Sequence, residues 1–351
     1  MRWDNLRVET EAGHRLPGYR DEAVVRTFDA PEALDIRFYE IHARSALNRV
    51  PKQSRMPFPW TINPYRGCTH ACAYCFARPT HTYLDFDSGR DFEREIVVKV
   101  NVPELLRAEL ARPAWKREHV ALGTNTDPYQ WVEGRYKLMP GIWEAFRDFA
   151  NPCSVLTKSP LLLRDKALLQ QVAERAPVTA SFSVPTLDEK IWRASEPHTP
   201  NPRARLEAVA ELNRAGIPTG ILIAPLMPGI NDSPQQVDRI VELAVEAGAV
   251  SIGGIALHLR GEVRGIFMDW LRAQRPDLVP RYEELYRRSA YAPREVQERA
   301  RRLARKPGAA PRSRRFLRDR EGDAAERDPG EREDMETTGH PLPQVAQPSL
   351  F

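Results

Sequence analysis

The sequence predicts an α/β protein built on a parallel sheet. From about residue 57 onward, short β-branched runs alternate with amphipathic segments, which is the pattern of successive strand–helix units. Helix-capping residues support this pattern: Asp232 and Ser233 provide an N-cap before Pro234, and Gly216 and Gly248 stand where helices should end. Six such units fit either a doubly wound sheet or an incomplete (β/α) barrel, and periodicity alone leaves both open.

The predicted elements follow one another along the chain. Strands are expected at residues 60–63, 119–123, 154–157, 178–184, 219–224 and 250–256. The helices between them are expected at residues 103–112, 141–150, 164–175, 203–215 and 234–247. After residue 256 the alternation ends, and the remaining amphipathic stretches predict helices at residues 263–273, 280–289 and 294–306.

Composition divides the chain into four parts. Residues 1–55 are polar and turn-rich, which predicts an N-terminal extension that packs partly on the following domain. Residues 56–260 carry the strand–helix units, and residues 261–310 are expected to form C-terminal helices. Residues 311–351 are rich in Pro, Gly, Arg, Asp and Glu, with few large apolar groups. Burial cannot offset the ordering entropy of such a segment, so a disordered tail is expected.

The composition argues against a membrane protein and against a secreted, disulfide-rich one. No run of about 18 uncharged apolar residues is present, and the N-terminus lacks the apolar core of a signal peptide. The chain has 4 cysteines, three of them within eight residues, which is too few and too clustered for a disulfide framework. A cytoplasmic protein with cysteines kept free for metal is expected.

Cys68, Cys72 and Cys75 form the clearest motif of the sequence. Thiolates select zinc or iron–sulfur clusters, and three of them on one loop can reach three corners of a [4Fe–4S] cluster. A structural zinc site needs a fourth ligand, which His70 or His81 could supply, but such sites usually pair two cysteines with a second distant pair. The residues therefore favour a cluster with one iron left open, with zinc as the alternative.

The spacing Cys-x3-Cys-x2-Cys, with Tyr74 before the third cysteine, resembles the signature of the radical SAM superfamily. The resemblance implies a [4Fe–4S] cluster whose open iron binds S-adenosylmethionine, and a 5′-deoxyadenosyl radical released by reductive cleavage. It also implies an external one-electron donor of the flavodoxin or ferredoxin type. The implied fold is a partial (β/α)6 TIM-like barrel with the cluster loop after the first strand. Tyr74 and Phe76 would shield the cluster and the adenine from water, although core packing explains either equally well.

Three further motifs resemble the branch of the superfamily related to spore photoproduct lyase: Gly-Thr-Asn-Thr-Asp-Pro-Tyr-Gln at 123–130, Thr-Lys-Ser at 157–159 and Glu-Pro-His at 196–198. Residues 45–51 and 81–85 resemble more closely an actinobacterial, mycobacterial-type group of radical SAM proteins without an assigned reaction. The likeness covers roughly residues 1–290. It implies an enzyme of lyase or transferase type.

The resemblance places S-adenosylmethionine at the carboxyl ends of the strands, where parallel barrels carry their chemistry. The polar turn after the second strand should hold the amino group of the cofactor, and Lys158 its carboxylate. Arg205 should share that carboxylate through its planar fork, unless it forms an ordinary ion pair. Ser181 and Ser183 alternate on one face of the fourth strand and would bind the ribose, or would simply fill the barrel interior. The turn residues are Thr124, Asn125, Thr126 and Asp127.

One departure from the lyase pattern concerns the hydrogen donor. Spore photoproduct lyases carry a cysteine in the turn after the second strand, about where this chain has Thr124, and a hydroxyl cannot replace a thiol in that reaction. Cys153 starts the third strand, at the end of the barrel opposite the cluster, and is expected to be a buried structural residue. Reversal of the spore lesion is therefore not expected, unless Tyr65, Tyr83 or Tyr129 takes that role.

The charge pattern of the C-terminal region points to nucleic acid. From Arg287 to Arg320 the chain has thirteen Arg and Lys against three Asp and Glu, and from 321 to 336 eight acidic residues face two basic ones. Such a segment could be a solvated helix followed by disorder, or a phosphate contact. The final residues, Gln347 to Phe351, resemble the pentapeptide that binds the bacterial DNA sliding clamp. We therefore expect a radical SAM enzyme acting on DNA, in lesion repair, or on another nucleic acid. The alternative is a non-catalytic, zinc- or cluster-stabilised DNA-binding protein.

Overall fold

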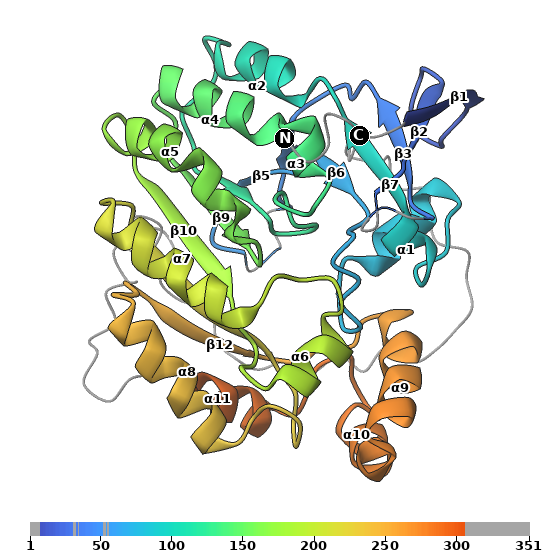
Figure 1. Cartoon of the computed structure of the whole chain (residues 1–351), viewed down its shortest axis with the longest axis vertical. Helices are drawn as coiled ribbons and strands as arrows, with labels where there is room; N and C mark the ends of the chain where they lie inside the picture. Colours follow the sequence, from blue (N-terminus) through green and yellow to red (C-terminus); the bar gives the residue numbers. More distant parts are fainter. Residues whose placement is uncertain (1–7, 31–32, 34, 52–53, 55, 306–351) are drawn as a thin grey trace, which may run out of the picture.

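The computed structural model describes residues 8–30, 33, 35–51, 54 and 56–305, and its largest element is a seven-stranded sheet (Figure 1). Six of its strands are parallel and follow chain order across the sheet: β5 (Trp60–Ile62), β8 (Val120–Leu122), β9 (Cys153–Thr157), β10 (Val178–Ser183), β11 (Thr219–Leu226) and β12 (Ile252–Ala256). A doubly wound sheet would reverse its order at a switch point, whereas a barrel keeps chain order. The predicted partial (β/α)6 barrel is therefore confirmed.

The barrel is open between its two edge strands. β4 (Leu47–Arg49) pairs antiparallel with β5 at one edge, and β12 forms the other edge. The central strands are apolar because both of their faces are covered, and all three residues of β8 are buried. Covering helices pack on the outer face, as the sequence predicted: α2 (Val102–Leu110), α4 (Leu138–Asp148), α5 (Lys166–Ala173), α7 (Pro202–Arg214) and α8 (Pro234–Glu246).

A second sheet stands beside the barrel and was only partly expected. Its strand order is β1-β2-β3-β7-β6, made of β1 (Val8–His14), β2 (Ala23–Phe28), β3 (Arg37–Ile41), β7 (Glu95–Lys99) and β6 (Tyr65–Arg66). The sequence prediction did not include β7, although all five of its residues are buried. Strand β3 pairs in parallel with β7, so the N-terminal extension packs by adding strands to a segment that follows the cysteines.

Short helical segments connect the strands on the side of the cysteines. They are η1 (Arg78–Leu84), α1 (Asp91–Arg94), α3 (Glu133–Tyr136), η2 (Pro160–Asp165) and α6 (Glu189–Ser195). The cysteine loop, defined here as residues 67–76, begins directly after β6 and ends before η1. Because β6 pairs with β7, the second sheet anchors the start of this loop.

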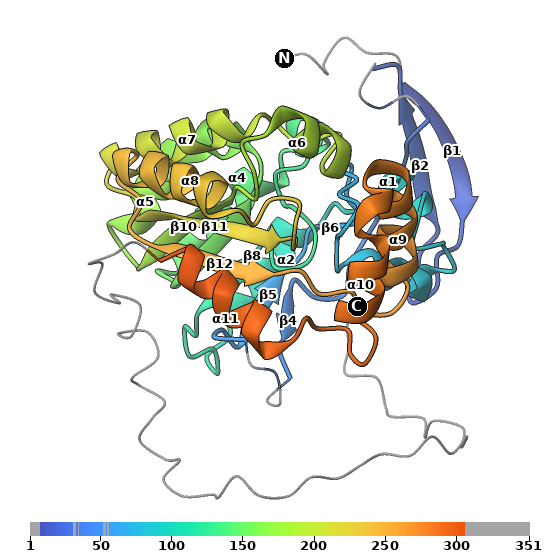
Figure 2. The same cartoon turned by 90° about the horizontal axis from the view of Figure 1, so that it is seen from below.

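The C-terminal helices are present where the sequence predicted them. They are α9 (Val263–Gln274), the one-turn η3 (Pro276–Leu278), α10 (Val279–Leu285) and α11 (Arg294–Leu303). Helix α11 lies along β12 (Figure 2), and a Cβ at Gly254 would stand 2.5 Å from the carbonyl oxygen of Ala300, so glycine permits this close approach. Within the described part of the chain, every helix is too short or too polar to cross a membrane.

The division at residues 55, 260 and 310 stays a prediction. Residues 306–351, which include the predicted tail and the clamp-like pentapeptide, lie outside the described residues.

Candidate active site

A cavity of about 180 Å³ lies at the carboxyl ends of the barrel strands. It is bounded by the cysteine loop on one side and by the ends of β8 to β12 on the other, which is where parallel barrels carry their active sites. Its lining residues are Cys68, His70, Cys72, Tyr74, Cys75, Phe76, Gly123, Asn125, Asp127, Leu156, Thr157, Lys158, Ser183, Leu222, Ala224, Pro225, Ile255, Leu257 and His258. The cavity thus joins thiols, charged groups and apolar side chains in one place.

The cysteine loop is held at its start by a buried glutamine. Gln130 donates to the carbonyl oxygen of Gly67 (3.1 Å) and accepts from the backbone N–H of Thr69 (2.9 Å). Gly67 has a φ of +79°, and a Cβ there would stand 2.9 Å from Cδ1 of Ile96, so only glycine fits this turn. The backbone N–H of Cys68 also donates to the carbonyl oxygen of Phe92 (2.9 Å).

Arg78 holds the middle of the cysteine loop from below. Its side chain is buried, and its guanidinium donates to the carbonyl oxygens of Cys72 (3.0 Å), Ala71 (3.3 Å) and Gly89 (2.8 Å). It also forms an ion pair with Glu93. An arginine buried in this way fixes the loop backbone and leaves the three thiols facing the cavity.

The environment of the thiols fits a metal group. Burial raises the pKa of all three, to about 12 for Cys68. Thiolates at these positions therefore need a positively charged partner in the cavity, and iron–sulfur clusters are held by thiolates. Among the described residues, no set of three or more His, Cys, Asp or Glu side chains is arranged to hold a single metal ion.

The two histidines considered for a zinc site lie in different places. The Nε2 atom of His81 is 2.8 Å from the carbonyl oxygen of Glu95, and its ring does not line the cavity. His70 does line the cavity, with Nδ1 3.4 Å from Oδ2 of Asp127. Burial lowers the pKa of both rings to about 4, so both are neutral at pH 7. Nε2 of His70 is buried and has no hydrogen-bond partner among the described residues, which leaves it as a polar contact for a bound group.

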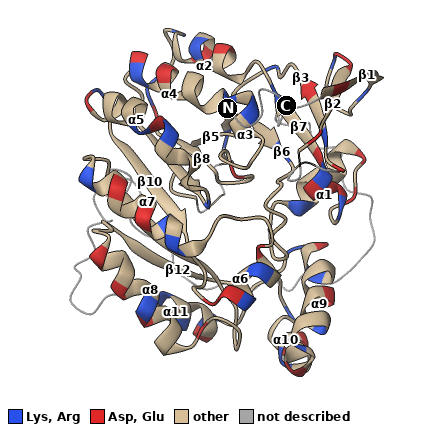
Figure 3. Cartoon of the chain, viewed as in Figure 1, with Lys and Arg blue, Asp and Glu red and all other residues tan. Residues whose placement is uncertain are grey.

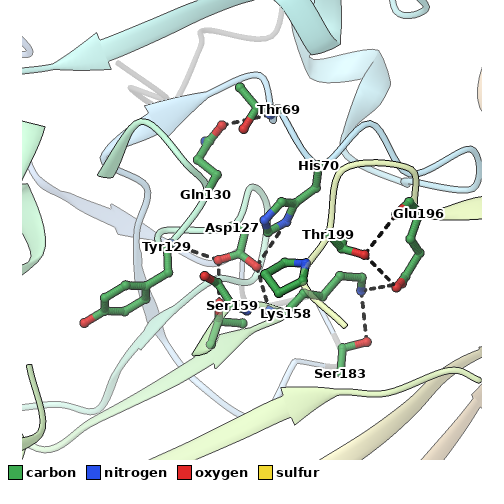
Figure 4. A network of polar contacts seen from close by, with 12 residues as sticks. Thr69, His70, Asp127, Tyr129, Gln130, Lys158, Ser159, Ser183, Glu196 and Thr199 are labelled. Atoms are coloured by element: carbon green, nitrogen blue, oxygen red, sulfur yellow. Dashed lines mark hydrogen bonds and ion pairs between the residues drawn. The ribbon is translucent and has the colours of Figure 1, made fainter. Parts of the chain in front are cut away.

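Asp127 organises the side of the cavity below His70 (Figure 4). One carboxylate oxygen accepts from the hydroxyl of Thr157 (2.6 Å) and from the backbone N–H of Tyr129 (2.9 Å). The other accepts from the backbone N–H of Lys158 (2.7 Å). Asp127 therefore ties the turn after β8 to the end of β9 and fixes the backbone from which Lys158 projects.

Lys158 is a charged side chain of the cavity wall, and the fully buried Glu196 lies beside it. Nζ of Lys158 donates to Oγ of Ser183 (2.9 Å) and lies 3.5 Å from Oε1 of Glu196, which also accepts a hydrogen bond from the hydroxyl of Tyr74. Burial alone would raise the pKa of Glu196, but Arg205 and Lys158 hold it at about 2. Burial alone would also lower the pKa of Lys158, but Glu196 together with Cys72 and Asp127 raises it above its ordinary value, so the lysine is charged.

The guanidinium of Arg205 is hydrogen-bonded to other groups of the protein. It donates to Oε2 of Glu196 (2.7 Å), to the hydroxyl of Thr199 (2.6 Å) and to the carbonyl oxygens of Ser183 (2.8 Å) and Pro200 (2.8 Å). It is fully buried and does not line the cavity. The sequence-based expectation that Arg205 shares a cofactor carboxylate with Lys158 therefore does not fit its place, which is a buried ion pair.

The predicted site residues divide into two groups. Those that line the cavity are Cys68, Cys72, Cys75, Tyr74, Asn125, Asp127, Lys158 and Ser183. Those that do not are Thr124, Thr126, Ser181 and Arg205. The Thr126 hydroxyl instead donates to the carbonyl oxygen of Tyr65 (2.8 Å), because this residue packs under the cavity floor. Ser181 lies two residues before Ser183 on β10 and does not line the cavity.

Neither Cys153, expected to be structural, nor the three tyrosines named as alternative hydrogen donors line the cavity. Cys153 is fully buried at the first residue of β9, the opposite end of the barrel, as predicted. Tyr65 and Tyr129 are fully buried and donate to Glu133 and Asp165, respectively. Tyr83 is 59% exposed and does not line the cavity.

Sequence reasoning missed several residues of the site, because their roles depend on distant segments. The roles of His70, Glu196, Gln130, Arg78 and His258 were not predicted. For His70 the signal was its position between two cysteines, and for Glu196 it was the Glu-Pro-His motif that the sequence had already singled out. Phe76 was expected to shield the cavity, but it is 49% exposed at its mouth.

Comparisons with known proteins place the chain among related sequences. The sequence model of the radical SAM superfamily matches residues 62–249, more than half of the 351 residues. Uncharacterized proteins of Mycobacterium tuberculosis and Mycobacterium bovis are 48% identical over 302 residues, covering 85% of this chain and 89% of theirs. An uncharacterized protein of Methanocaldococcus jannaschii is 27% identical over 203 residues, covering 56% of this chain and 70% of that protein.

Solved structures give a more distant likeness. A mutant of spore photoproduct lyase is 15% identical, with a TM-score of 0.49, and the match covers 70% of this chain and 71% of that one.

Proposed function

The chain belongs to the radical SAM superfamily and is an enzyme that uses a [4Fe–4S] cluster and S-adenosylmethionine, and we propose that Cys68, Cys72 and Cys75 are the cluster ligands. The observation that carries this proposal is that these three thiols line one cavity, while Cys153 lies at the far end of β9. Three protein ligands leave one iron open. When bound, the reduced cluster supplies the electron that cleaves S-adenosylmethionine into methionine and a 5′-deoxyadenosyl radical.

Lys158 is the proposed partner of the cofactor carboxylate. It is a charged side chain on the cavity wall, and Glu196, Cys72 and Asp127 together keep it protonated although it is largely buried. Ser183 accepts from its Nζ atom and so aims it, and Arg205 positions it indirectly by holding Glu196. A cation balanced in this way can turn part of its hydrogen-bonding capacity toward an incoming carboxylate.

Asn125 and Asp127 are the proposed partners of the cofactor amino group. Both line the cavity directly after β8, on the side facing the cysteine loop. The amide oxygen of Asn125 and a carboxylate oxygen of Asp127 can accept from an ammonium group. Thr124, Thr126 and Ser181 are not kept as direct contacts, since they do not line the cavity. Tyr74 takes part through Glu196, because its hydroxyl is bound there.

Nucleic acid is the proposed substrate class, with lesion repair in DNA as one form of it. The support is electrostatic: from Arg287 to Arg305 the chain has seven arginines and two glutamates, and all seven arginines are exposed. Figure 3 marks the lysines and arginines along the chain in blue. Three of the seven arginines pair with carboxylates, and for the other four no ion pair is found among the described residues. Exposed arginines on one segment suit a phosphate backbone.

Thiol-dependent reversal of the spore lesion is not proposed. Cys153 is buried and distant from the cavity, and burial raises the pKa of its thiol. Membership of the superfamily also argues against the alternative of a non-catalytic, zinc-stabilised DNA-binding protein. The electron would come from an external donor of the flavodoxin or ferredoxin type, in the reducing environment of the cytoplasm.

Cofactor cleavage tests the proposal directly. The full chain is reconstituted without oxygen with iron and sulfide, reduced with dithionite and given S-adenosylmethionine, and 5′-deoxyadenosine is measured by chromatography. Wild type should bind about four irons per chain and form 5′-deoxyadenosine. Cys75→Ala should lose both, whereas Cys153→Ala, which removes a thiol outside the cavity, should keep both. An intact, iron-loaded wild type that forms no 5′-deoxyadenosine would refute the proposal.

The clamp contact of Gln347 to Phe351 stays a separate prediction, since these residues lie outside the described part of the chain. A pull-down with purified bacterial sliding clamp tests it. The full chain should retain the clamp, and replacing Leu350 and Phe351 by Ala should abolish retention. Equal retention of the clamp by the full chain and by this variant would contradict the prediction.

A further inference from the structure

Three aromatic rings form a row that leads out of the cavity mouth. The ring row consists of Phe76, His258 and Tyr291. The ring centroids of Phe76 and His258 are 5.8 Å apart, and those of His258 and Tyr291 are 5.6 Å apart with the planes only 23° from parallel. Phe76 and His258 line the cavity, whereas Tyr291 lies beyond it. The row therefore runs from the cavity wall to the outer surface.

The ring row is exposed in a way that core packing does not explain. Phe76 is 49% exposed and Tyr291 is 47% exposed, and large rings in a core are normally covered. Both rings contact His258: Phe76 is tilted against it by 36°, and Tyr291 is stacked on it. Burial and the charge of Arg260 lower the pKa of His258, so its ring is neutral at pH 7 and stacks as an aromatic ring.

The backbone beneath the ring row is fixed. The segment after β12 is tied to the segment before α11 by the N–H of Leu259 donating to the carbonyl oxygen of Ala290 (2.7 Å). The hydroxyl of Tyr286 donates to the carbonyl oxygen of Leu257 (2.8 Å), and His258 and Tyr291 form an isolated antiparallel bridge. Because these hydrogen bonds already fix the backbone beneath the ring row, binding of a ligand there costs little conformational entropy.

Positive charge surrounds the outer end of the ring row. The guanidinium of Arg260 lies over the ring of Tyr291, 5.9 Å from its centroid. Arg288 is exposed three residues before Tyr291, and Arg294 is exposed three residues after it, at the start of the basic helix α11. Aromatic faces combined with arginines on a surface are how proteins bind unpaired nucleotides, with rings stacking on bases and cations contacting phosphates.

We propose that the ring row binds the bases of a single-stranded nucleic acid and brings one base to the cavity mouth. This inference rests on the proposed function, since it places the substrate beside the cavity in which S-adenosylmethionine would be cleaved. The nucleotides must be unpaired, because a base can stack on a protein ring only if one of its faces is open, and a base inside a duplex has no open face. The arginines from 287 to 305 then follow the phosphate backbone away from the mouth.

Fluorescence anisotropy of labelled oligonucleotides on the full, cluster-loaded chain tests the ring row. Four probes of equal length are used: a single-stranded DNA, the same sequence as RNA, the same DNA with abasic sites, and its duplex. Tyr291→Ala should weaken binding of the single-stranded DNA roughly tenfold, because stacking on an aromatic ring contributes most of one base's affinity. The same substitution should change binding of the abasic DNA less than twofold. The RNA probe decides which single strand is preferred.

Three matched variants complete the test. Tyr291→Phe keeps the ring and should bind like wild type, and Tyr83→Ala, which removes another exposed tyrosine outside the cavity, should do so too. Arg288→Ala should weaken the single-stranded and abasic DNA equally and reduce the salt dependence of binding by about one charge. Light-induced crosslinking of an oligonucleotide containing 5-iodouracil, followed by peptide mass spectrometry, should place the crosslink on Phe76, His258 or Tyr291.

The proposal is overturned if Tyr291→Ala affects the abasic and the intact DNA alike, or if no single strand binds at all. Preference for the duplex, or crosslinks confined to other residues, would overturn it as well. Formation of 5′-deoxyadenosine by wild type without nucleic acid reports on the cofactor site alone, so failure there and failure of base stacking are distinguishable.

Discussion

Lys158 and Lys99 are both largely buried, but they have different neighbours. Lys158 lies beside a negatively charged side chain, whereas Lys99 lies beside a positively charged one. Lys158 lies in the cavity wall, 3.5 Å from Glu196, and burial does not prevent its pKa from rising above the ordinary value. Lys99 lies on β7 of the second sheet, and burial together with the charge of Arg66 lowers its pKa to about 7. Among the described residues, Lys99 has no ion pair. The cavity wall thus keeps its lysine charged, whereas the lysine of the second sheet is about half charged at pH 7.

The charged cavity wall depends on the carboxylate of Glu196, whereas Lys99 has no carboxylate partner among the described residues. Glu196 and Arg205 are fully buried, and each makes up for the charge of the other. A buried ion costs several kcal/mol unless it is paired and hydrogen-bonded, so this arrangement persists only as a complete set. The comparison predicts large effects when the set is broken and smaller ones elsewhere.

The largest effect is expected for Glu196→Gln. This change leaves Arg205 and Lys158 without their counter-charge in a buried place. The free energy of unfolding, measured by urea denaturation at pH 7, should fall by about 3–5 kcal/mol. The double variant Glu196→Gln with Arg205→Met should recover part of the loss, because it removes the uncompensated cation. A loss below about 1 kcal/mol would show that the wall does not depend on charge balance.

The next effect concerns cofactor affinity. Lys158→Met removes the cation of the cavity wall but leaves the pair of Glu196 and Arg205 intact. Equilibrium dialysis of S-adenosylmethionine against the cluster-loaded enzyme should show affinity about 10- to 100-fold weaker, the loss typical of a charged hydrogen bond. Lys166→Met, which removes a half-exposed lysine paired with Glu211, is the control and should bind normally. Unchanged affinity in Lys158→Met would show that this lysine does not contact the cofactor.

Lys99 should give stability a pH dependence of a definite sign. Between pH 7 and about 10 the unfolded chain carries a proton on this lysine and the folded chain does not, so folding is favoured as pH rises. The stability of wild type relative to Lys99→Met should therefore increase by about 1 kcal/mol per pH unit from pH 7.5 to 9.5. Lys190→Met, at an exposed position, is the control, and its stability difference should be flat. A flat difference for Lys99→Met would mean that the lysine stays charged.

The smallest effect is expected on the surface. Glu189 and Arg193 form an exposed ion pair one helical turn apart on α6, close in sequence to Glu196. Glu189→Gln should change the free energy of unfolding by about 0.5 kcal/mol or less, because water and salt screen the pair. Thermal unfolding of the Glu189→Gln and Glu196→Gln variants measures the difference between the exposed and the buried pair. A change as large as that of Glu196→Gln would contradict the role assigned to burial.

The barrel could be predicted because its signals are local. Each strand and its following helix carry their own periodicity, so the six parallel strands and the C-terminal helices were found close to their true bounds. Strand β7 was missed because nothing near Glu95 to Lys99 indicates a partner, and that partner, β3, lies 58 residues earlier in the chain. The resemblance to the radical SAM superfamily, which rested on the spacing of three cysteines, is confirmed by the family match.

The candidate site could be predicted only in part. The strand-end position of Asn125, Asp127, Lys158 and Ser183 predicted that they lie together, and all four line the cavity because parallel strands share one edge; their role as cofactor contacts stays a prediction. The prediction failed for Arg205, since the helix pattern could not show that Glu196 captures its guanidinium. Ser181 shares a face of β10 with Ser183 but does not line the cavity, because alternation predicts the face of a strand and not the position of a cavity along it.

By itself, the sequence determined the alternation of strands and helices and the loop of three cysteines, since periodicity and short spacing act within a few residues. Only the tertiary structure decided which charges meet. Glu196 reaches Tyr74, 122 residues away in the chain, as well as Lys158 and Arg205, while Lys99 meets Arg66 instead. The physical reason is that the pKa of a buried group depends on the partners that folding places within a few ångströms of it, and those partners can come from any part of the chain.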